Sequence, residues 1–181
     1  HTVTEWLAEH HPNADGTRPD LAHRIDRETS GLLACGRTKD ATRAMKRSFV
    51  QREVEKAYLA LVFGRVSADL FTVDAPLRLT EEVKVIMEVA EGGLPSVTTC
   101  RVLRRGRLDD GVPVTLVACH PLTGRQHQIR VHLAHLGHPL LGDKIYGGSK
   151  ERFLRFANGA ATDEDRAAVR LDRHALHAFR L

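Results

Sequence analysis

The sequence predicts a single α+β domain with a largely antiparallel mixed sheet that is flanked by helices and loops. Strand-like segments outnumber helix-like segments, and they follow one another in succession instead of alternating strictly with helices. A chain of 181 residues is long enough to bury the core of one domain, and we expect that domain to span residues 1–181. Hydrophobic residues at 42% and charged residues at 28% are typical of a globular protein.

The first half of the chain supplies one helix and one buried strand. Apolar residues recur at helical spacing over residues 39–50, and Thr38 or Asp40 is placed to cap the start of that helix. Residues 56–63 form a short, mostly apolar run that Gly64 closes. Such a run predicts a strand that is buried in the sheet.

Three further strands are expected in the middle of the chain. Apolar and charged residues alternate over residues 83–89, which predicts a strand with one packed face. Residues 97–103 and 112–120 predict two more strands, joined by a basic turn over residues 104–111.

Two helices complete the expected fold. Apolar residues return to helical spacing after Arg125, and Gly137 sits where that helix would end. The last helix is expected over residues 163–171, with Thr162 and Asp165 placed as a capping box.

Charge and cysteine content restrict the function only weakly. The pI of 9.2 and net charge of +4 come mainly from arginine, whose planar fork suits phosphate, but such a charge is also ordinary for a soluble surface. The three cysteines contain no C-x-x-C pair and suggest a reduced, cytoplasmic protein. No apolar run approaches the ~20 residues that span a bilayer, so we expect no membrane segment.

The first segment whose side chains could act in catalysis or binding is HRIDRETSGLL, from His23 to Leu33. It allows two interpretations, and the residues alone do not decide between them. Asp26 could belong to a capped surface turn, since Asp, Thr and Ser side chains bond to nearby backbone. It could equally be a carboxylate presented between cations, with Arg24 or Arg27 keeping it ionised.

The second such segment runs from His120 to Gly148. Its expected helix has an opening turn where free N–H groups and the helix dipole favour phosphate binding. That turn contains Arg125, Gln126, His127 and Gln128. Arg130 adjoins an apolar residue, so it is either a surface residue or a buried arginine, and a buried arginine implies a carboxylate partner.

Motifs for metals and cofactors do not emerge from the sequence. His132, His135 and His138 recur at intervals of three, but no H-E-x-x-H pattern accompanies them, so we expect no metal site. Phosphate-binding loops, dinucleotide fingerprints and nucleophile elbows are also missing. If the protein is an enzyme, the missing motifs favour an isomerase or hydrolase that needs no cofactor over a kinase or dehydrogenase.

Three motifs together resemble one family. HRIDRETSGLL is similar to the H-R-[LI]-D-x-x-T-S-G-[LV] signature of RluA-type pseudouridine synthases. Residues 124–147 resemble the second long motif of that family, and EKAYLALVFG (residues 55–64) resembles the segment that carries its active-site tyrosine. The motifs occur in the family's order, and the resemblance runs from about residue 18 to the C-terminus.

The resemblance implies an enzyme that isomerises uridines in ribosomal or transfer RNA after flipping the base. Asp26 would be the catalytic aspartate, Tyr58 would stack on the uracil, and Arg130 would pair with Asp26. The other residues that we expect to contact RNA are His23, Arg24, Thr29, Arg125, Gln126, His127 and Gln128. RNA is the expected partner, no cofactor or metal is needed, and we expect a monomer.

Two departures and two alternatives accompany this assignment. Family members usually begin with a strand ahead of the region found here and end with one more strand, so we expect both to be lacking. A non-catalytic RNA-binding module is one alternative, although the intact Asp, Tyr and Arg set argues against it. A histidine-ligated metal hydrolase is the other.

Overall fold

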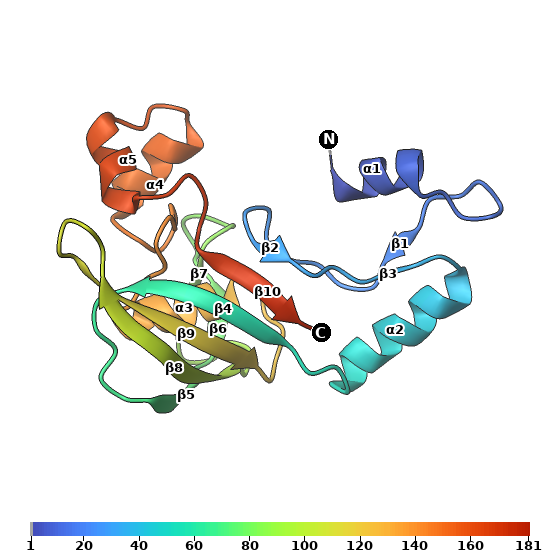
Figure 1. The fold of residues 1–181 in the computed structure, drawn as a ribbon, viewed down its shortest axis with the longest axis horizontal. Coiled ribbons are helices and arrows are strands. Elements are labelled where there is room, and N and C mark those ends of the chain that lie inside the picture. Colours follow the sequence, from blue (N-terminus) through green and yellow to red (C-terminus); the bar gives the residue numbers. More distant parts are fainter. Residues whose placement is uncertain (1) are drawn as a thin grey trace.

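The computed structural model describes residues 2–181 and confirms the α+β class (Figure 1). A six-stranded mixed sheet forms the body of the domain, and its neighbours are antiparallel except for the parallel pair at one edge. In spatial order its strands are β2 (Ser30–Gly31), β10 (Leu176–Arg180), β4 (Ala57–Phe63), β9 (Pro113–Pro121), β8 (Val97–Arg107) and β5 (Leu70–Asp74).

Two small strand pairs and five helices surround this sheet within the described residues. The pairs are β1 (Asp20–Leu21) with β3 (Cys35–Gly36) and β6 (Leu77–Leu79) with β7 (Met87–Val89). The helices are α1 (Val3–His10), α2 (Lys39–Gln51), α3 (Gln128–His135), α4 (Lys150–Ala157) and α5 (Asp163–Val169). In Figure 1, α1 and α2 lie to one side of the sheet, and α4 and α5 lie to the other. None of the helices over residues 2–181 has the length and apolarity needed to cross a membrane.

The core lies between the sheet and α3. Successive side chains of a strand point to opposite faces, so Tyr58, Ala60 and Val62 of β4 share one face. Ala60 and Val62 are buried there against Ile129 and Leu133 of α3, and Tyr58 packs at the margin of the same cluster. This face therefore brings Tyr58 close to the helix that carries the second motif.

Most of the expected elements are confirmed, with two corrections in the middle of the chain. Residues 83–89 are not one strand: only Met87–Val89 pairs, because the Ile86 N–H donates to the Val83 carbonyl (2.9 Å) and closes a turn. β8 continues to Arg107, since Arg107 pairs with Pro113 of β9. The basic segment is thus mostly strand, and the reversal itself is short. The sequence analysis did not assign α1, α4 or β10.

One glycine is required where the first motif meets the C-terminal strand. Gly31 has a φ of +110°, and a Cβ at this position would lie 2.2 Å from the Ala178 carbonyl oxygen. The pairing of β2 with β10 holds the backbones this close, because the Leu32 N–H donates to the same oxygen (2.9 Å). A side chain at Gly31 would separate the two strands.

We expect Gly31→Ala to lower the free energy of unfolding by about 3 kcal/mol or more, since strain at positive φ adds to a backbone clash. Gly16→Ala is the matched control, because Gly16 has a φ of +75° but nothing within 4 Å of its Cβ position. That control should cost only about 1 kcal/mol. Urea unfolding of both variants measures the difference, and equal losses would show that the close approach does not matter.

Candidate active site

Asp26 lies in a turn between β1 and β2, and its carboxylate pairs with a cation other than the expected Arg24 or Arg27. Its backbone carbonyl accepts from the Thr29 N–H (3.0 Å), which closes a turn. Its carboxylate Oδ2 accepts from Arg130 Nη1 (3.0 Å). The cation on Asp26 is thus Arg130, whereas Arg27 faces solvent with its side chain 94% exposed and lies 3.9 Å from Glu28.

Arg130 is buried and has the carboxylate partners that its burial requires. Besides Asp26, it binds Asp143, with Nε at 2.7 Å from Oδ2 and Nη2 at 2.9 Å from Oδ1. Asp143 is fully buried and also accepts from the N–H groups of Ile145 and Tyr146. A buried Arg130 implies a carboxylate partner, but the sequence does not identify Asp143 as that partner. The available signal was an aspartate directly after a buried apolar run, at Gly142-Asp143.

These contacts determine the charges of the group. Burial disfavours the charged guanidinium, but the hydrogen bonds and charges of Asp143 and Asp26 more than offset this and raise the pKa of Arg130. Burial also disfavours the Asp143 carboxylate, yet Arg130 and the two N–H groups outweigh it and lower the pKa of Asp143. A bidentate pair of this kind fixes the direction in which the guanidinium points. The third nitrogen is therefore directed at Asp26.

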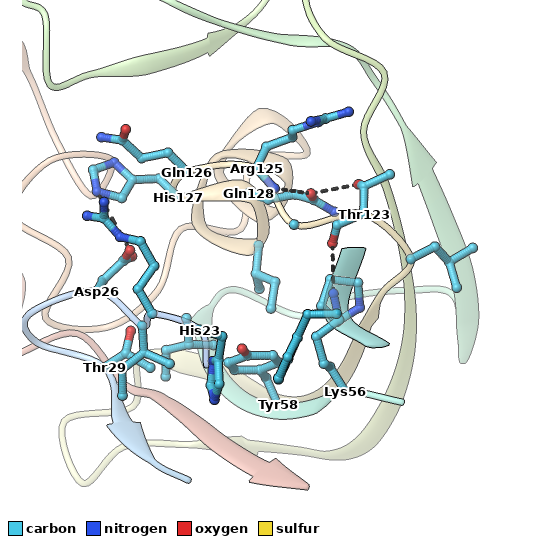
Figure 2. A pocket seen from close by; sticks show the side chains of 18 of the residues that line it. His23, Asp26, Thr29, Lys56, Tyr58, Thr123, Arg125, Gln126, His127 and Gln128 are labelled. Carbon is cyan, nitrogen blue, oxygen red and sulfur yellow. Dashed lines mark hydrogen bonds and ion pairs between the residues drawn. The ribbon is translucent and has the colours of Figure 1, made fainter. Parts of the chain in front are cut away.

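Asp26, Tyr58 and Arg130 line one pocket of about 710 Å³. Tyr58 reaches it from β4, and burial together with the charge of Asp26 raises the pKa of the phenol. Figure 2 shows Asp26 and His127 at one end of the pocket, Lys56 and Thr123 at the other, and Tyr58 between them. The three residues expected to form the catalytic site are therefore brought together.

The charged side chains that line the pocket are mostly cationic. Six lysines and arginines contribute to it, against one carboxylate, that of Asp26. The cations are Arg24, Lys46, Arg52, Lys56, Arg125 and Arg130. Lys56 is half-buried and donates to the Thr123 carbonyl (3.4 Å), while burial and Arg52 lower its pKa. Lys46, Arg52 and Lys56 are not expected here from the sequence: Lys46 lies on α2, Arg52 caps the end of that helix, and Lys56 directly precedes β4.

Two residues expected to contact RNA line the pocket and have bonds within the protein. The Gln128 amide is used in full within the protein: it accepts from Thr123 and the Arg125 N–H, and it donates to Val97 and Thr98 of β8. The Thr29 side chain is buried and bonds to His174 (2.7 Å). The Gln128 amide therefore has no hydrogen-bonding group left for substrate, whereas the Thr29 hydroxyl makes one bond and still lines the pocket.

The other expected contact residues lie on the pocket. His23 lines it while its Nε2 accepts from the Ala34 N–H (3.0 Å), and its ring stacks on Phe49. Arg24 and Gln126 are exposed lining residues. Arg125 also lines the pocket, and its Nε donates to the Pro95 carbonyl (3.2 Å).

The opening turn of the second motif differs from the expectation. α3 begins at Gln128, not at Arg125, because His127 adopts a left-handed conformation with φ of 54°. The Arg125 N–H, which was expected to be free for phosphate, donates to Gln128 Oε1 (3.0 Å). His127 thereby turns away from the helix and lies with Nε2 3.9 Å from Asp26 Oδ1.

The histidines of the second motif have separate partners. His132 is buried between Thr98 and the Ala75 carbonyl, and His138 bonds to the Phe63 carbonyl. Over residues 2–181, His, Cys, Asp and Glu side chains do not gather in groups of three or more that could hold a metal ion.

Comparison with known proteins identifies the family. A family model described as RNA pseudouridylate synthase matches residues 3–135. The chain belongs to this family. Ribosomal large subunit pseudouridine synthase D of Nitrosomonas europaea is 39% identical over 99% of this chain and 48% of its own length. The dual-specificity RNA pseudouridine synthase RluA of Vibrio parahaemolyticus is 38% identical over 80% of this chain and 61% of its own.

Solved structures agree with this assignment. Human RNA Pseudouridylate Synthase Domain Containing 1 superimposes with a TM-score of 0.72 at 36% identity, over 89% of this chain and 62% of that one. Human RNA Pseudouridylate Synthase Domain Containing 4, at 24% identity and a TM-score of 0.69, supports the fold. The expected RluA-type family is confirmed, and the chain spans about half the length of the curated synthase D relative from Nitrosomonas.

We expect Asp143→Asn to lower the free energy of unfolding by about 3–5 kcal/mol, because it leaves a buried guanidinium short of a charged partner. Asp69→Asn is the control, since Asp69 is an exposed carboxylate bonded to Arg105 (2.6 Å). The control should change stability by less than about 1 kcal/mol. Urea unfolding measures both, and a similar small loss in the two variants would contradict the importance of the buried pair.

His174 predicts a loss of stability in acid. It is buried beside Thr29, and burial together with Arg130 lowers its pKa to about 4. Between pH 6.5 and 4 the unfolded chain therefore binds a proton that the native protein does not, so lowering the pH favours unfolding, by at most about 1.4 kcal/mol per pH unit for this residue. His174→Gln should flatten the dependence measured by urea unfolding. His120→Gln, at an exposed position, should leave it unchanged.

Proposed function

We propose that this protein converts uridine to pseudouridine in RNA, with Asp26 as the catalytic carboxylate. The observation that carries the proposal is the Asp26–Arg130–Asp143 group at the end of a cationic pocket, in a chain of the pseudouridylate synthase family. Ribosomal RNA is the first substrate to test, because relatives are named for the large ribosomal subunit. Transfer RNA is the second, and a cytoplasmic monomer remains the expected form of the protein.

The chemistry agrees with the residues present. The reaction breaks the N1–C1′ bond of uridine, rotates the uracil and joins C5 to C1′; C5 loses a proton and N1 takes one up, so the product is an isomer of the substrate. It involves no oxidation and no second substrate, so positioned charges can supply what it needs. Arg130 holds the Asp26 carboxylate through Oδ2 and leaves Oδ1 for the nucleoside.

Access to the reacting atoms requires the base to leave the RNA stack. A flipped nucleotide costs a few kcal/mol of lost stacking and pairing, and a pocket of about 710 Å³ lies within the range that holds small ligands. The Tyr58 ring stacks against the uracil in this arrangement. Arg24, Arg52 and Lys56 lie along the same pocket, and their contacts to flanking phosphates offset part of the cost.

We expect Asp26→Asn to abolish pseudouridine formation while leaving the fold intact, because the amide keeps the shape of the side chain but removes its negative charge. The measurement is pseudouridine mapping of total ribosomal and transfer RNA from cells that lack the gene and carry either the wild type or the variant. Positions restored by the wild type alone identify the target.

Asp40→Asn serves as the control, since Asp40 is an exposed carboxylate in the first turn of α2. It should restore every position that the wild type restores. A variant Asp26→Asn that also restores them would overturn Asp26 as the catalytic residue. A wild type that binds RNA in a salt-dependent manner but restores no position would instead indicate a non-catalytic RNA-binding module.

A further inference from the structure

Tyr146 connects three groups of the site, and neither its position nor its bonds were expected from the sequence. Its hydroxyl oxygen accepts from the Met87 N–H (3.0 Å) and lies 2.8 Å from His127 Nδ1. The Arg130 guanidinium lies over its ring at 5.1 Å from the centroid. Its own N–H donates to Asp143 (3.0 Å). Tyr146 therefore contacts the buried ion pair and the histidine beside Asp26.

The bonds at the Tyr146 oxygen favour one tautomer of His127. The Met87 N–H occupies one lone pair of that oxygen, and within residues 2–181 its other hydrogen-bond partner is His127 Nδ1, so the phenol proton is paired only if it is donated to Nδ1. Nδ1 then accepts, and a neutral imidazole must carry its proton on Nε2. This arrangement leaves the phenol proton paired within a largely buried contact.

The Nε2 atom of His127 lies near the free oxygen of the candidate catalytic carboxylate. Nε2 lies 3.9 Å from Asp26 Oδ1, while Arg130 occupies Oδ2. A separation of 3.9 Å is too long for a hydrogen bond, so the donor is not consumed by Asp26. Figure 2 shows His127 next to Asp26 at the same end of the pocket, where a substrate oxygen can contact both.

We propose that Tyr146 is a positioning residue that holds His127 in the tautomer protonated at Nε2, and that this N–H donates a hydrogen bond to an oxygen of the bound uridine beside Asp26. The inference deepens the proposed function, on which its second half rests. It assigns His127 a specific donor role in place of the general RNA contact expected from the sequence.

The charges around His127 are consistent with a neutral ring. Burial lowers the pKa of His127, the guanidiniums of Arg130 and Arg24 lower it further, and the carboxylates of Asp26 and Asp143 oppose them. The net direction is downward from a value that is already below 7. At neutral pH the ring is therefore uncharged, so which of its two nitrogens donates depends on Tyr146.

The tautomer is measured directly by ¹⁵N NMR of the histidine side chains, which distinguishes a protonated from an unprotonated ring nitrogen without any substrate. We expect His127 in the wild type to be protonated at Nε2 and unprotonated at Nδ1 at pH 7.5. Tyr146→Phe keeps the ring beneath Arg130 but removes the hydroxyl, and should give a mixture of tautomers. A wild type protonated at Nδ1, or an unchanged tautomer in Tyr146→Phe, would overturn the positioning role.

Two substitutions of His127 test the donor role in pseudouridine formation. Gln places an N–H₂ group near the position of Nε2, whereas Asn places one near Nδ1 and suits the left-handed backbone of this residue. We expect His127→Asn to lower kcat about 100-fold, as for the loss of one preorganised donor. His127→Gln keeps a donor near Nε2 and should lower kcat only about tenfold. Tyr146→Phe should lower kcat about tenfold with KM changed less than twofold.

His135→Gln is the control, because His135 is exposed on the same helix and its substitution should leave kcat and KM unchanged. Circular dichroism and urea unfolding verify that each variant is folded before its rate is compared. His127→Asn with wild-type kcat would overturn the donor role alone. A wild type that forms no pseudouridine would overturn the proposed function, while the NMR result would still decide the tautomer.

Discussion

The site depends on one buried interaction, the bidentate pair between Arg130 and Asp143. Taking two charges out of water is costly, and the cost is met here by short, directed bonds and by two backbone N–H groups on the same carboxylate. The pair fixes the guanidinium so that its remaining nitrogen points at Asp26. It thereby joins three segments that are far apart in the sequence: α3, the loop before β2, and the loop after Leu141.

The sheet and the C-terminal strand keep the other residues in place around that pair. Alternation along β4 puts Tyr58 on the face that α3 covers. The loop of Asp26 is tied to the C-terminal segment by Thr29 to His174 and by Ser30 to His177, and Gly31 lets β2 lie against β10. Residues positioned by several independent contacts lose little freedom when substrate binds, which favours a preorganised site.

Local patterns in the sequence predicted the elements well, whereas long-range partners were largely beyond them. The helix predicted over residues 39–50 follows from periodicity, and the strand of Tyr58 follows from a short apolar run. Motif resemblance pairs Asp26 with Arg130. The roles of Asp143 and Tyr146 could not be predicted, because they depend on contacts with Arg130 that local sequence spacing does not reveal. The internal bonds of the Gln128 amide could not be predicted for the same reason: a polar residue in a motif looks alike whether its partner is substrate or β8.

The backbone conformation of His127 explains why His127 faces the pocket while the amide of its neighbour Gln128 bonds within the protein. A left-handed conformation at a residue other than glycine costs on the order of 1 kcal/mol or more, and here it occurs at His127, directly before α3. On one side of this residue, the Gln128 amide makes four bonds to β8 and the preceding loop. The His127 ring itself bonds to Tyr146 through Nδ1. These contacts maintain the strained backbone of His127 and occupy Nδ1, so Nε2 is the ring nitrogen left to face the pocket. The free-energy cost of the strained backbone is therefore linked to the position of the Nε2–H donor.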